Sequence, residues 1–402
     1  MARRTTPDPD EFDRIVDRRG TGCIKWDFMR STFSRDDLLP LWIADMDFLS
    51  PEPIRSALVE RAEHGVYGYS GLCDEDRRAA CSWFQRRHGW RVDPGWIVPT
   101  PGIIPAIGWI IQAFTKPGDA VAVQPPVYYP FYELIRANHR EIALNPLVLE
   151  NNRYTMDIDG LRRLLAGGRV KLFILCSPHN PVGRVWKPAE LAALASACTE
   201  AGVPVLADEI HGDLVFPATG CKHVPFASLP AAATCHLATC TSPSKTFNLA
   251  GLQASNIIMP SGASRQQFRA VLDGVGFKDP NCFAGAAQRA AYTDPECEAW
   301  LGRLLAYLQG NLDHLRQFLA DRLPWVTLVE PEGTYLAWLD FRARYPDHEA
   351  LAQKMQQEAG LALDEGHIFG SNGDGFERIN IACPRALLQR ALDQMAAAFE
   401  KP

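Results

Sequence analysis

The sequence predicts an α/β protein that has a large domain, with a mostly parallel sheet covered by helices, and a smaller α+β domain. Short apolar runs that end in polar residues recur between residues 119 and 245, with helical patterns between them. Strands that are apolar on both faces and alternate with helices are typical of a parallel sheet buried on both sides. After about residue 290, long helical patterns precede two further strand patterns, which indicates the smaller domain.

Capping residues and apolar periodicity indicate the helices. "SPEPIRSALVERAEHG" (50–65) predicts a helix that Ser50 caps, with Pro51 suited to its first position and Gly65 at its end. "TPGIIPAIGWIIQAF" (100–114) predicts a tight turn that leads into an apolar helix.

Four strand patterns form the predicted sheet, and two more belong to the smaller domain. The four are "DAVAVQPPVYYPF" (119–131), "VKLFILCSPHNP" (170–181), "GVPVLADEI" (202–210) and "CHLATCTSPSK" (235–245). The two others are "GTYLAWLDF" (333–341) and "RINIACPR" (378–385). We therefore expect an N-terminal arm with part of the small domain in residues 1–50, the large domain in 51–290 and the C-terminal small domain in 291–402.

The composition is that of a soluble globular protein, with 47% hydrophobic and 22% charged residues. The net charge is −6 and no basic stripe is present, so a nucleic-acid partner is not expected. No apolar run is long enough for a membrane span, and none follows the first arginines as in a secretory signal. The 11 cysteines are scattered without a CxxC pair, so we expect no metal site and a cytoplasmic location.

Polar residues gather where the predicted strands end, in "QPPVYYP", "CSPHNP", "ADEIHGD" and "TSPSK". Ligands of open α/β sheets bind at the carboxyl ends of the strands, so these residues are expected to surround one site. Lys245 comes directly after a buried strand, where a partly desolvated amine can form a Schiff base with an aldehyde.

Pyridoxal phosphate is the common protein-bound aldehyde, and the strand ends hold a candidate for each group that it needs. Asp208 would pair with the ring nitrogen, and Tyr128 would stack on the ring face. Asn180 would donate to the phenolate oxygen, with His211 on the same side of the ring. Helix-start amides and nearby hydroxyls would bind the phosphate, and the candidates are Gly102, Ile103, Ile104, Ser242 and Ser244.

Each of these residues alone has an ordinary structural explanation, such as a turn glycine, a core tyrosine or a helix-capping aspartate. The prediction of a site depends on their joint occurrence at the strand ends of one sheet.

Several stretches resemble the fold-type I pyridoxal-phosphate enzymes of the aspartate aminotransferase superfamily. These are "SPSK" followed by "AG", together with "ADEIH" and "PHNPVGRVW". Others resemble the bacterial cystathionine β-lyase or C–S lyase group in particular: "LPLWIADMDF" (39–48), "VYGYS" (66–70), "RRHGW" (86–90), "EGTYLAWLDF" (332–341) and "FERINIACPR" (376–385). The resemblance begins near residue 24, continues to the end of the chain and implies a seven-stranded sheet.

This resemblance implies a lyase that cleaves the Cβ–S bond of L-cystathionine or a related cysteine S-conjugate, releasing a thiol, pyruvate and ammonia. Lys245 would hold the cofactor and then act as the base, with Asp208 and Tyr128 as the other catalytic residues.

The resemblance also implies how the substrate is held and how subunits associate. Arg378 would bind the substrate carboxylate, and Asn180, Ala44 and Asp45 would lie beside the substrate. Tyr67 would reach the phosphate of the neighbouring subunit, which implies a homodimer with shared active sites.

The sequence departs from the aminotransferase pattern at Gln253, which stands eight residues after the lysine where an arginine is usual. This glutamine favours the lyase branch. Gly212 stands where that branch usually has serine, so the pocket is expected to differ from that of a housekeeping cystathionine lyase.

Two other interpretations stay open. The chain could catalyse another reaction on the same cofactor, either transamination or β-elimination from a large S-conjugate in secondary metabolism. It could also be a regulatory binding protein that retains the cofactor. A requirement for a 2-oxo acid would identify a transaminase, and partner binding that survives Lys245→Ala would identify a regulator.

Overall fold

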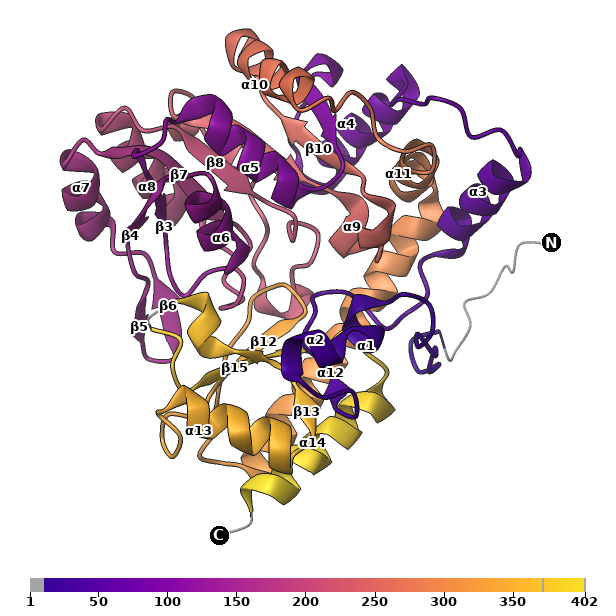
Figure 1. Cartoon of the computed structure of the whole chain (residues 1–402), viewed down its shortest axis with the longest axis vertical. Coiled ribbons are helices and arrows are strands. Elements are labelled where there is room, and N and C mark those ends of the chain that lie inside the picture. The colour runs from indigo at the N-terminus through magenta and orange to yellow at the C-terminus, as the bar shows by residue number, and fades with distance from the viewer. Residues whose placement is uncertain (1–10, 371, 401–402) are drawn as a thin grey trace.

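A seven-stranded sheet forms the centre of the large domain in the computed structural model, which describes residues 11–370 and 372–400 (Figure 1). The strand order is β2-β10-β9-β8-β7-β3-β4. β10 runs antiparallel to both neighbours, and the other pairs are parallel. The strands are β2 (Ile97–Thr100), β3 (Ala120–Val123), β4 (Glu141–Leu144), β7 (Val170–Cys176), β8 (Val205–Asp208), β9 (His236–Thr241) and β10 (Ser255–Ile258). The predicted fold class is confirmed.

Helices cover both faces of this sheet, as its continuous apolar strands require. Alternate residues of β3 show the division, since Val121 belongs to one buried cluster and Ala122 to the other. The first face packs against α5 (Ile103–Phe114), α6 (Pro130–Ala137) and α10 (Gly262–Gly274). The second packs against α7 (Ile158–Ala166) and α8 (Pro188–Glu200).

The strand register aligns the ends of three neighbouring parallel strands. Asp208, the last residue of β8, lies opposite Cys176 of β7 and Cys240 of β9. The loops that follow these strands therefore begin at the same edge of the sheet. This edge is where the sequence predicted the site.

A four-stranded antiparallel sheet forms the C-terminal part of the chain, in the order β11-β12-β15-β14. Its strands are β11 (Thr327–Val329), β12 (Leu336–Asp340), β14 (Asp364–Glu365) and β15 (Phe376–Asn380). The long α12 (Pro295–Arg322) and α14 (Arg385–Phe399) pack into one core cluster with residues of β12 and β15. The same cluster includes residues of α3 (Glu52–Glu63), α4 (Asp74–His88) and α11 (Ala284–Thr293). The exact domain boundaries stay a prediction.

The N-terminal segment is joined to the C-terminal sheet region, and residues 1–10 of the predicted arm lie outside the described residues. β1 (Leu39–Pro40) pairs in parallel with β13 (Leu361–Ala362). The chain then runs through residues 42–48, which we call the N-terminal strap. Figure 1 shows this N-terminal region, with α1 (Ile24–Asp27) and α2 (Met29–Phe33), beside the C-terminal elements.

A buried ion cluster fixes the strap. Lys25 is fully buried, and its Nζ donates to Asp47 Oδ2 at 2.5 Å. Arg18 bridges Asp45 and Asp47 at 2.6 and 2.7 Å. Removing one member of a buried pair leaves an uncompensated charge, at a cost of about 3–5 kcal/mol, so this cluster constrains where the strap can lie.

The predicted cap of the helix at residues 50–65 is wrong. α3 begins at Glu52 with Pro51 as its N-cap, and Ser50 Oγ instead donates to the carbonyl of Asn248 at 3.3 Å. The tertiary contact with Asn248 therefore overrides the local capping preference of serine.

Among the residues that the structure describes, no helix is both long and apolar enough to cross a membrane.

Candidate active site

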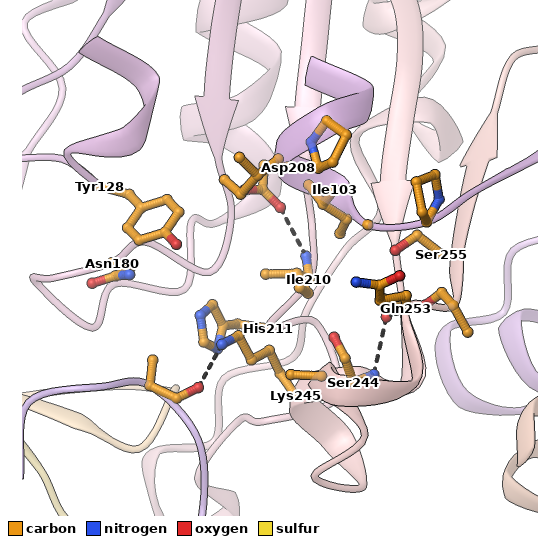
Figure 2. Close-up of a pocket in the computed structure, with 18 of the residues that line it drawn as sticks. Ile103, Tyr128, Asn180, Asp208, Ile210, His211, Ser244, Lys245, Gln253 and Ser255 are labelled. Atoms are coloured by element: carbon orange, nitrogen blue, oxygen red, sulfur yellow. Dashed lines mark hydrogen bonds between the residues drawn. The ribbon is translucent and has the colours of Figure 1, made fainter. Parts of the chain in front are cut away.

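A pocket of about 180 Å³ lies at the carboxyl edge of β7, β8 and β9 (Figure 2). Most of the residues predicted from the sequence line it: Ala44, Gly102, Ile103, Ile104, Tyr128, Asn180, Asp208, His211, Ser242, Ser244 and Lys245. Asp45 and Arg378 are not part of this lining. Asp45 follows Ala44 in the chain, and Arg378 donates a hydrogen bond to Asn180. Tyr67 lies elsewhere on the molecule.

Lys245 projects from a one-turn helix, α9 (Pro243–Thr246), that directly follows β9. Its Nζ donates to the carbonyl oxygen of Ala44 in the N-terminal strap at 2.5 Å. Burial lowers the pKa of Lys245 to about 8, an effect that the charge of Asp45 partly opposes and that of Arg378 reinforces. About a tenth of this amine is therefore unprotonated at pH 7, far more than for an ordinary lysine, and this is the form that a nucleophile or a base requires.

A buried carboxylate anchors α9 from behind the pocket. Asp213 Oδ2 accepts from the hydroxyl of Thr246 at 2.8 Å and from Trp83 Nε1 at 3.1 Å. Its other oxygen lies 3.0 Å from His88 Nε2. Since Thr246 directly follows the lysine, these contacts fix the backbone from which Lys245 projects.

Asp208 lies at the end of β8, where burial raises its pKa to about 7. Oδ1 accepts from the backbone N–H of Ile210 at 3.2 Å, which favours the charged form, as does the charge of Lys245. A carboxylate in such surroundings ionises readily only when a cation is placed against it. The position therefore suits a positively charged ligand atom.

Tyr128, Asn180 and His211 form the opposite side of the pocket (Figure 2). Burial raises the pKa of Tyr128 and lowers the pKa of His211, so both groups are neutral near pH 7. Asn180 Oδ1 accepts from Arg378 Nη1 at 2.9 Å, which leaves the amide nitrogen of Asn180 available to a ligand.

The remaining wall is the start of α5. Gly102 is its N-cap, and Ile103 and Ile104 are its first helical residues, so their amides are not used within the helix. Ser242 Oγ donates to the carbonyl of Ala254 at 2.6 Å and accepts from the amide of Ser244 at 3.0 Å. The hydroxyl proton of Ser242 is thus already engaged, whereas Ser244 keeps its hydroxyl for the pocket.

Gln253 and Ser244 point toward the same space in Figure 2. Gln253 has a φ of 53° and lines the pocket beside the start of α5. Apart from Lys245, no lysine or arginine lines the pocket within the described residues. An anion at the start of α5 would therefore rely on backbone amides, hydroxyls and the helix dipole.

Sequence reasoning missed the residues that hold the strap and Arg378 in place. Asn380 Nδ2 donates to the carbonyls of Ile43 and Asp45, and Asn248 Nδ2 donates to the carbonyls of Met46 and Phe48. Asn248 and Asn380 lie close to Lys245 and Arg378 in the sequence, and only the lysine and the arginine were predicted as site residues. The hydrogen-bond partners of the two asparagines are distant in sequence. Asp364, which forms a buried ion pair with Arg378, had no sequence signal at all.

Two predicted residues lie differently from the others. The carboxylate of Asp45 is paired with Arg18, so the side chain faces the buried ion cluster while its charge still acts on Lys245. Tyr67 is 58% exposed, and its hydroxyl donates to the carbonyl of Ala62 at 2.7 Å. It does not reach the pocket of its own chain.

The fold and the site define a member of a known family. Residues 36–395 match the family model of aminotransferase class I and II, and the chain belongs to that family. It is 44% identical to the cystathionine beta-lyase PatB of Bacillus subtilis over 96% of this chain and 99% of the relative.

Solved structures extend the similarity to three dimensions. A PLP-bound putative aminotransferase from Clostridium difficile superposes with a TM-score of 0.93 at 38% identity, over 96% of this chain and 99% of that chain. Cystalysin from Treponema denticola, a structure that contains pyridoxal 5'-phosphate, gives a TM-score of 0.92 at 35% identity. That match covers 97% of this chain and 98% of cystalysin.

The lowered pKa of Lys245 predicts that its amine loses its proton around pH 8 in cofactor-free protein, well below the ordinary lysine value of 10.5. Nuclear magnetic resonance of ¹³C-methylated lysines across pH would show this as one early titration. The resonance is assigned by its absence in Lys245→Met. A titration of Lys245 together with the exposed lysines would contradict the burial described above.

Proposed function

We propose that this protein is a pyridoxal-phosphate-dependent carbon–sulfur β-lyase. It would cleave the Cβ–S bond of L-cystathionine or a related cysteine S-conjugate to a thiol, pyruvate and ammonia. The observation that carries the proposal is the occurrence, within one pocket, of a buried amine whose pKa is lowered to about 8, Lys245, and a buried carboxylate that a cation would stabilise, Asp208.

The residues present fit pyridoxal phosphate. Lys245 would bind its aldehyde carbon, and Asp208 would pair with its protonated ring nitrogen, which resolves the unfavourable burial of that carboxylate. Asn180 would donate from Nδ2 to the phenolate oxygen, and Tyr128 and His211 would flank the ring. Gly102, Ile103, Ile104 and Ser244 would receive the phosphate at the start of α5, with Ser242 as the residue that shapes this loop.

The bound cofactor supplies an electron sink that stabilises negative charge at Cα of the substrate. Lys245 would remove the Cα proton with Nζ, because its lowered pKa makes the unprotonated amine accessible near neutral pH. Asp208 would keep the ring nitrogen protonated throughout, so that the sink persists while the thiolate leaves from Cβ. Lys245 would then give the proton taken from Cα to the departing sulfur, so that a thiol is released.

The strap and Arg378 would orient the substrate. Arg378 is buried on β15, and its guanidinium is positioned by Asn180 and by the carbonyl of Trp42 at 2.8 Å. It would bind the substrate carboxylate, which turns the Cα–H bond toward Lys245. Ala44 and Asp45 would close the pocket from the strap and exclude water from the reacting atoms.

Elimination predicts equal and sustained release of pyruvate and free thiol from L-cystathionine when no 2-oxo acid is added. The Lys245→Ala variant should lose roughly 10³-fold or more of this rate, because both the cofactor link and the base are removed. Coupled assays for pyruvate and for thiol measure the two products. Release that requires a 2-oxo acid would identify a transaminase, and normal turnover by Lys245→Ala would contradict the mechanism.

We also propose a homodimer whose active sites include Tyr67 of the neighbouring subunit. Support comes from four large apolar side chains that are exposed on and after α3: Val59, Val66, Tyr67 and Tyr69. An exposed apolar cluster of this kind is typical of a surface that another subunit covers.

Free thiols at all 11 cysteines support a reducing, cytoplasmic location.

Mixed dimers test the shared site. Subunits that carry only Lys245→Ala, refolded with an equal amount of subunits that carry only Tyr67→Ala, would form some native sites from complementary chains. We expect about a quarter of wild-type activity at limiting cofactor, from random pairing of two subunits. The matched control places both substitutions in one chain and mixes it with wild type, where no gain above the residual wild-type dimer is expected. A shared site thus predicts about a quarter of wild-type activity in both arrangements, whereas sites built within a single chain would leave the first mixture inactive and the control with about half, and that result would contradict a shared site.

A further inference from the structure

The guanidinium of Arg378 is already occupied at the nitrogen that a substrate carboxylate needs. Nη2 donates to the carbonyl of Trp42 at 2.8 Å and also to a carboxylate oxygen of Asp364. Nη1 donates to Asn180 Oδ1 at 2.9 Å. Nε is buried and has no hydrogen-bond partner within the described part of the chain.

The shape of a guanidinium makes this occupancy significant. It presents parallel N–H pairs along two edges, Nη1 with Nη2 and Nε with Nη2, because Cδ blocks the third edge. Nη2 therefore takes part in every bidentate contact with a carboxylate. A substrate that binds Arg378 in this way must take over a hydrogen that now points to Trp42 or to Asp364.

Asp364 is the competitor that carries charge. The strand register places it directly opposite Arg378 on β14 and β15, and it is 5% exposed. Among the described residues, the carboxylate of Asp364 has no other hydrogen-bond partner than Arg378. The Trp42 carbonyl is neutral, so the repulsion felt by an incoming carboxylate comes from Asp364.

We propose that Asp364 is a positioning residue that competes with the substrate carboxylate for Arg378, and that it thereby sets the affinity for amino-acid substrates and makes this affinity depend on pH. The substrate displaces Asp364 from Nη2 when it binds. Protonation of Asp364 removes the competing charge. The inference rests on the proposed role of Arg378 as the carboxylate-binding residue.

The surroundings of Asp364 place its titration in an accessible range. Burial raises its pKa to about 6, while Arg378 lowers it and Glu365 raises it. Asp364 also lines a cleft of about 410 Å³ beside α6, through which protons exchange with solvent. The other titratable or charged groups around it are Tyr128, Tyr129, Tyr132, Glu133, Arg136, His367 and Glu377.

The charge state of Asp364 determines how the affinity for carboxylates changes with pH. Above pH 6 Asp364 is charged and competes, so carboxylates bind weakly. Below pH 6 it becomes neutral and releases Nη2, so carboxylates bind more tightly. Asp364→Asn should show the tight binding at every pH, since the amide keeps the shape of the side chain without its charge.

Propionate is a suitable probe, because it has the carboxylate of a substrate but no amine to react with the cofactor. Its inhibition constant against β-elimination by the holoenzyme should rise as the pH rises through about 6 in the wild type. In Asp364→Asn the constant should be flat over this range and about ten-fold lower than wild type above pH 7. KM for the amino acid should fall in parallel, with kcat unchanged.

Glu377→Gln is the matched control. Glu377 is adjacent to Arg378 on β15, is 1% exposed, and has a pKa raised well above 4.5 by burial and by Glu365 and Asp364. Burial therefore favours the neutral acid form of Glu377, so that replacement by the amide should leave the propionate profile unchanged. Asp364→Ser provides a second neutral variant if the asparagine variant folds poorly, and the wild-type profile needs no variant.

The Arg378→Lys variant shows whether Arg378 binds the carboxylate at all, independently of any competition by Asp364. If propionate binds equally well to Arg378→Lys, the arginine does not hold the carboxylate, and that part of the proposed function fails. If Arg378→Lys weakens propionate while Asp364→Asn binds it no better than wild type, competition by Asp364 is wrong. A wild-type inhibition constant that does not change between about pH 5.5 and pH 7.5 would also overturn the inference.

Discussion

The burial of one amine and one carboxyl group in the same pocket is the constraint on which the rest of the site depends. Burial lowers the pKa of Lys245 to about 8 and raises that of Asp208 to about 7. Each group is therefore pushed toward its neutral form, and their mutual attraction only partly offsets this. A ligand that offers a cation to Asp208 and an aldehyde to Lys245 satisfies both groups together. The chemistry of the site follows from this shared desolvation.

The N-terminal strap is what completes that burial. Its Ala44 carbonyl accepts hydrogen bonds from Lys245 and from the hydroxyl of Tyr335, which belongs to the C-terminal part of the chain. The strap is in turn fixed by the buried Lys25–Asp47 pair and by the amide of Asn380. Three distant segments thus meet at one backbone carbonyl, so the environment of the lysine depends on how these segments pack.

Sequence reasoning reached the sheet and most of the pocket because the information is local. A buried parallel strand is a continuous apolar run, and Asp208 and Lys245 lie where two such runs end. The strands β2, β4 and β10 were not predicted, because none of them is a continuous apolar run: β2 contains Pro99, β4 begins with Glu141 and β10 begins with Ser255 and Asn256. The cap at Ser50 was predicted wrongly because a partner 198 positions away claims its hydroxyl.

Contacts between distant strands explain the remaining omissions. The competition at Arg378 needs the register that places Asp364 opposite it on two short antiparallel strands, and no local pattern encodes that register. Likewise, the engagement of Ser242 with the carbonyl of Ala254 depends on the turn that follows α9. Residue type and position predicted which groups gather at the site, whereas the hydrogen-bond partners of each group had to come from the structure.

The ionisation of Asp208 tests the central claim most directly. Infrared difference spectra between wild type and Asp208→Asn isolate the carboxyl stretch of this one residue. In cofactor-free protein the band of the protonated acid should disappear with a midpoint near pH 7. With pyridoxal phosphate bound, only the ionised form should be present from about pH 5 upward, since the ring nitrogen supplies the cation. A midpoint near the ordinary value of 3.8 in cofactor-free protein would contradict the account, as would a protonated acid that persists after the cofactor binds.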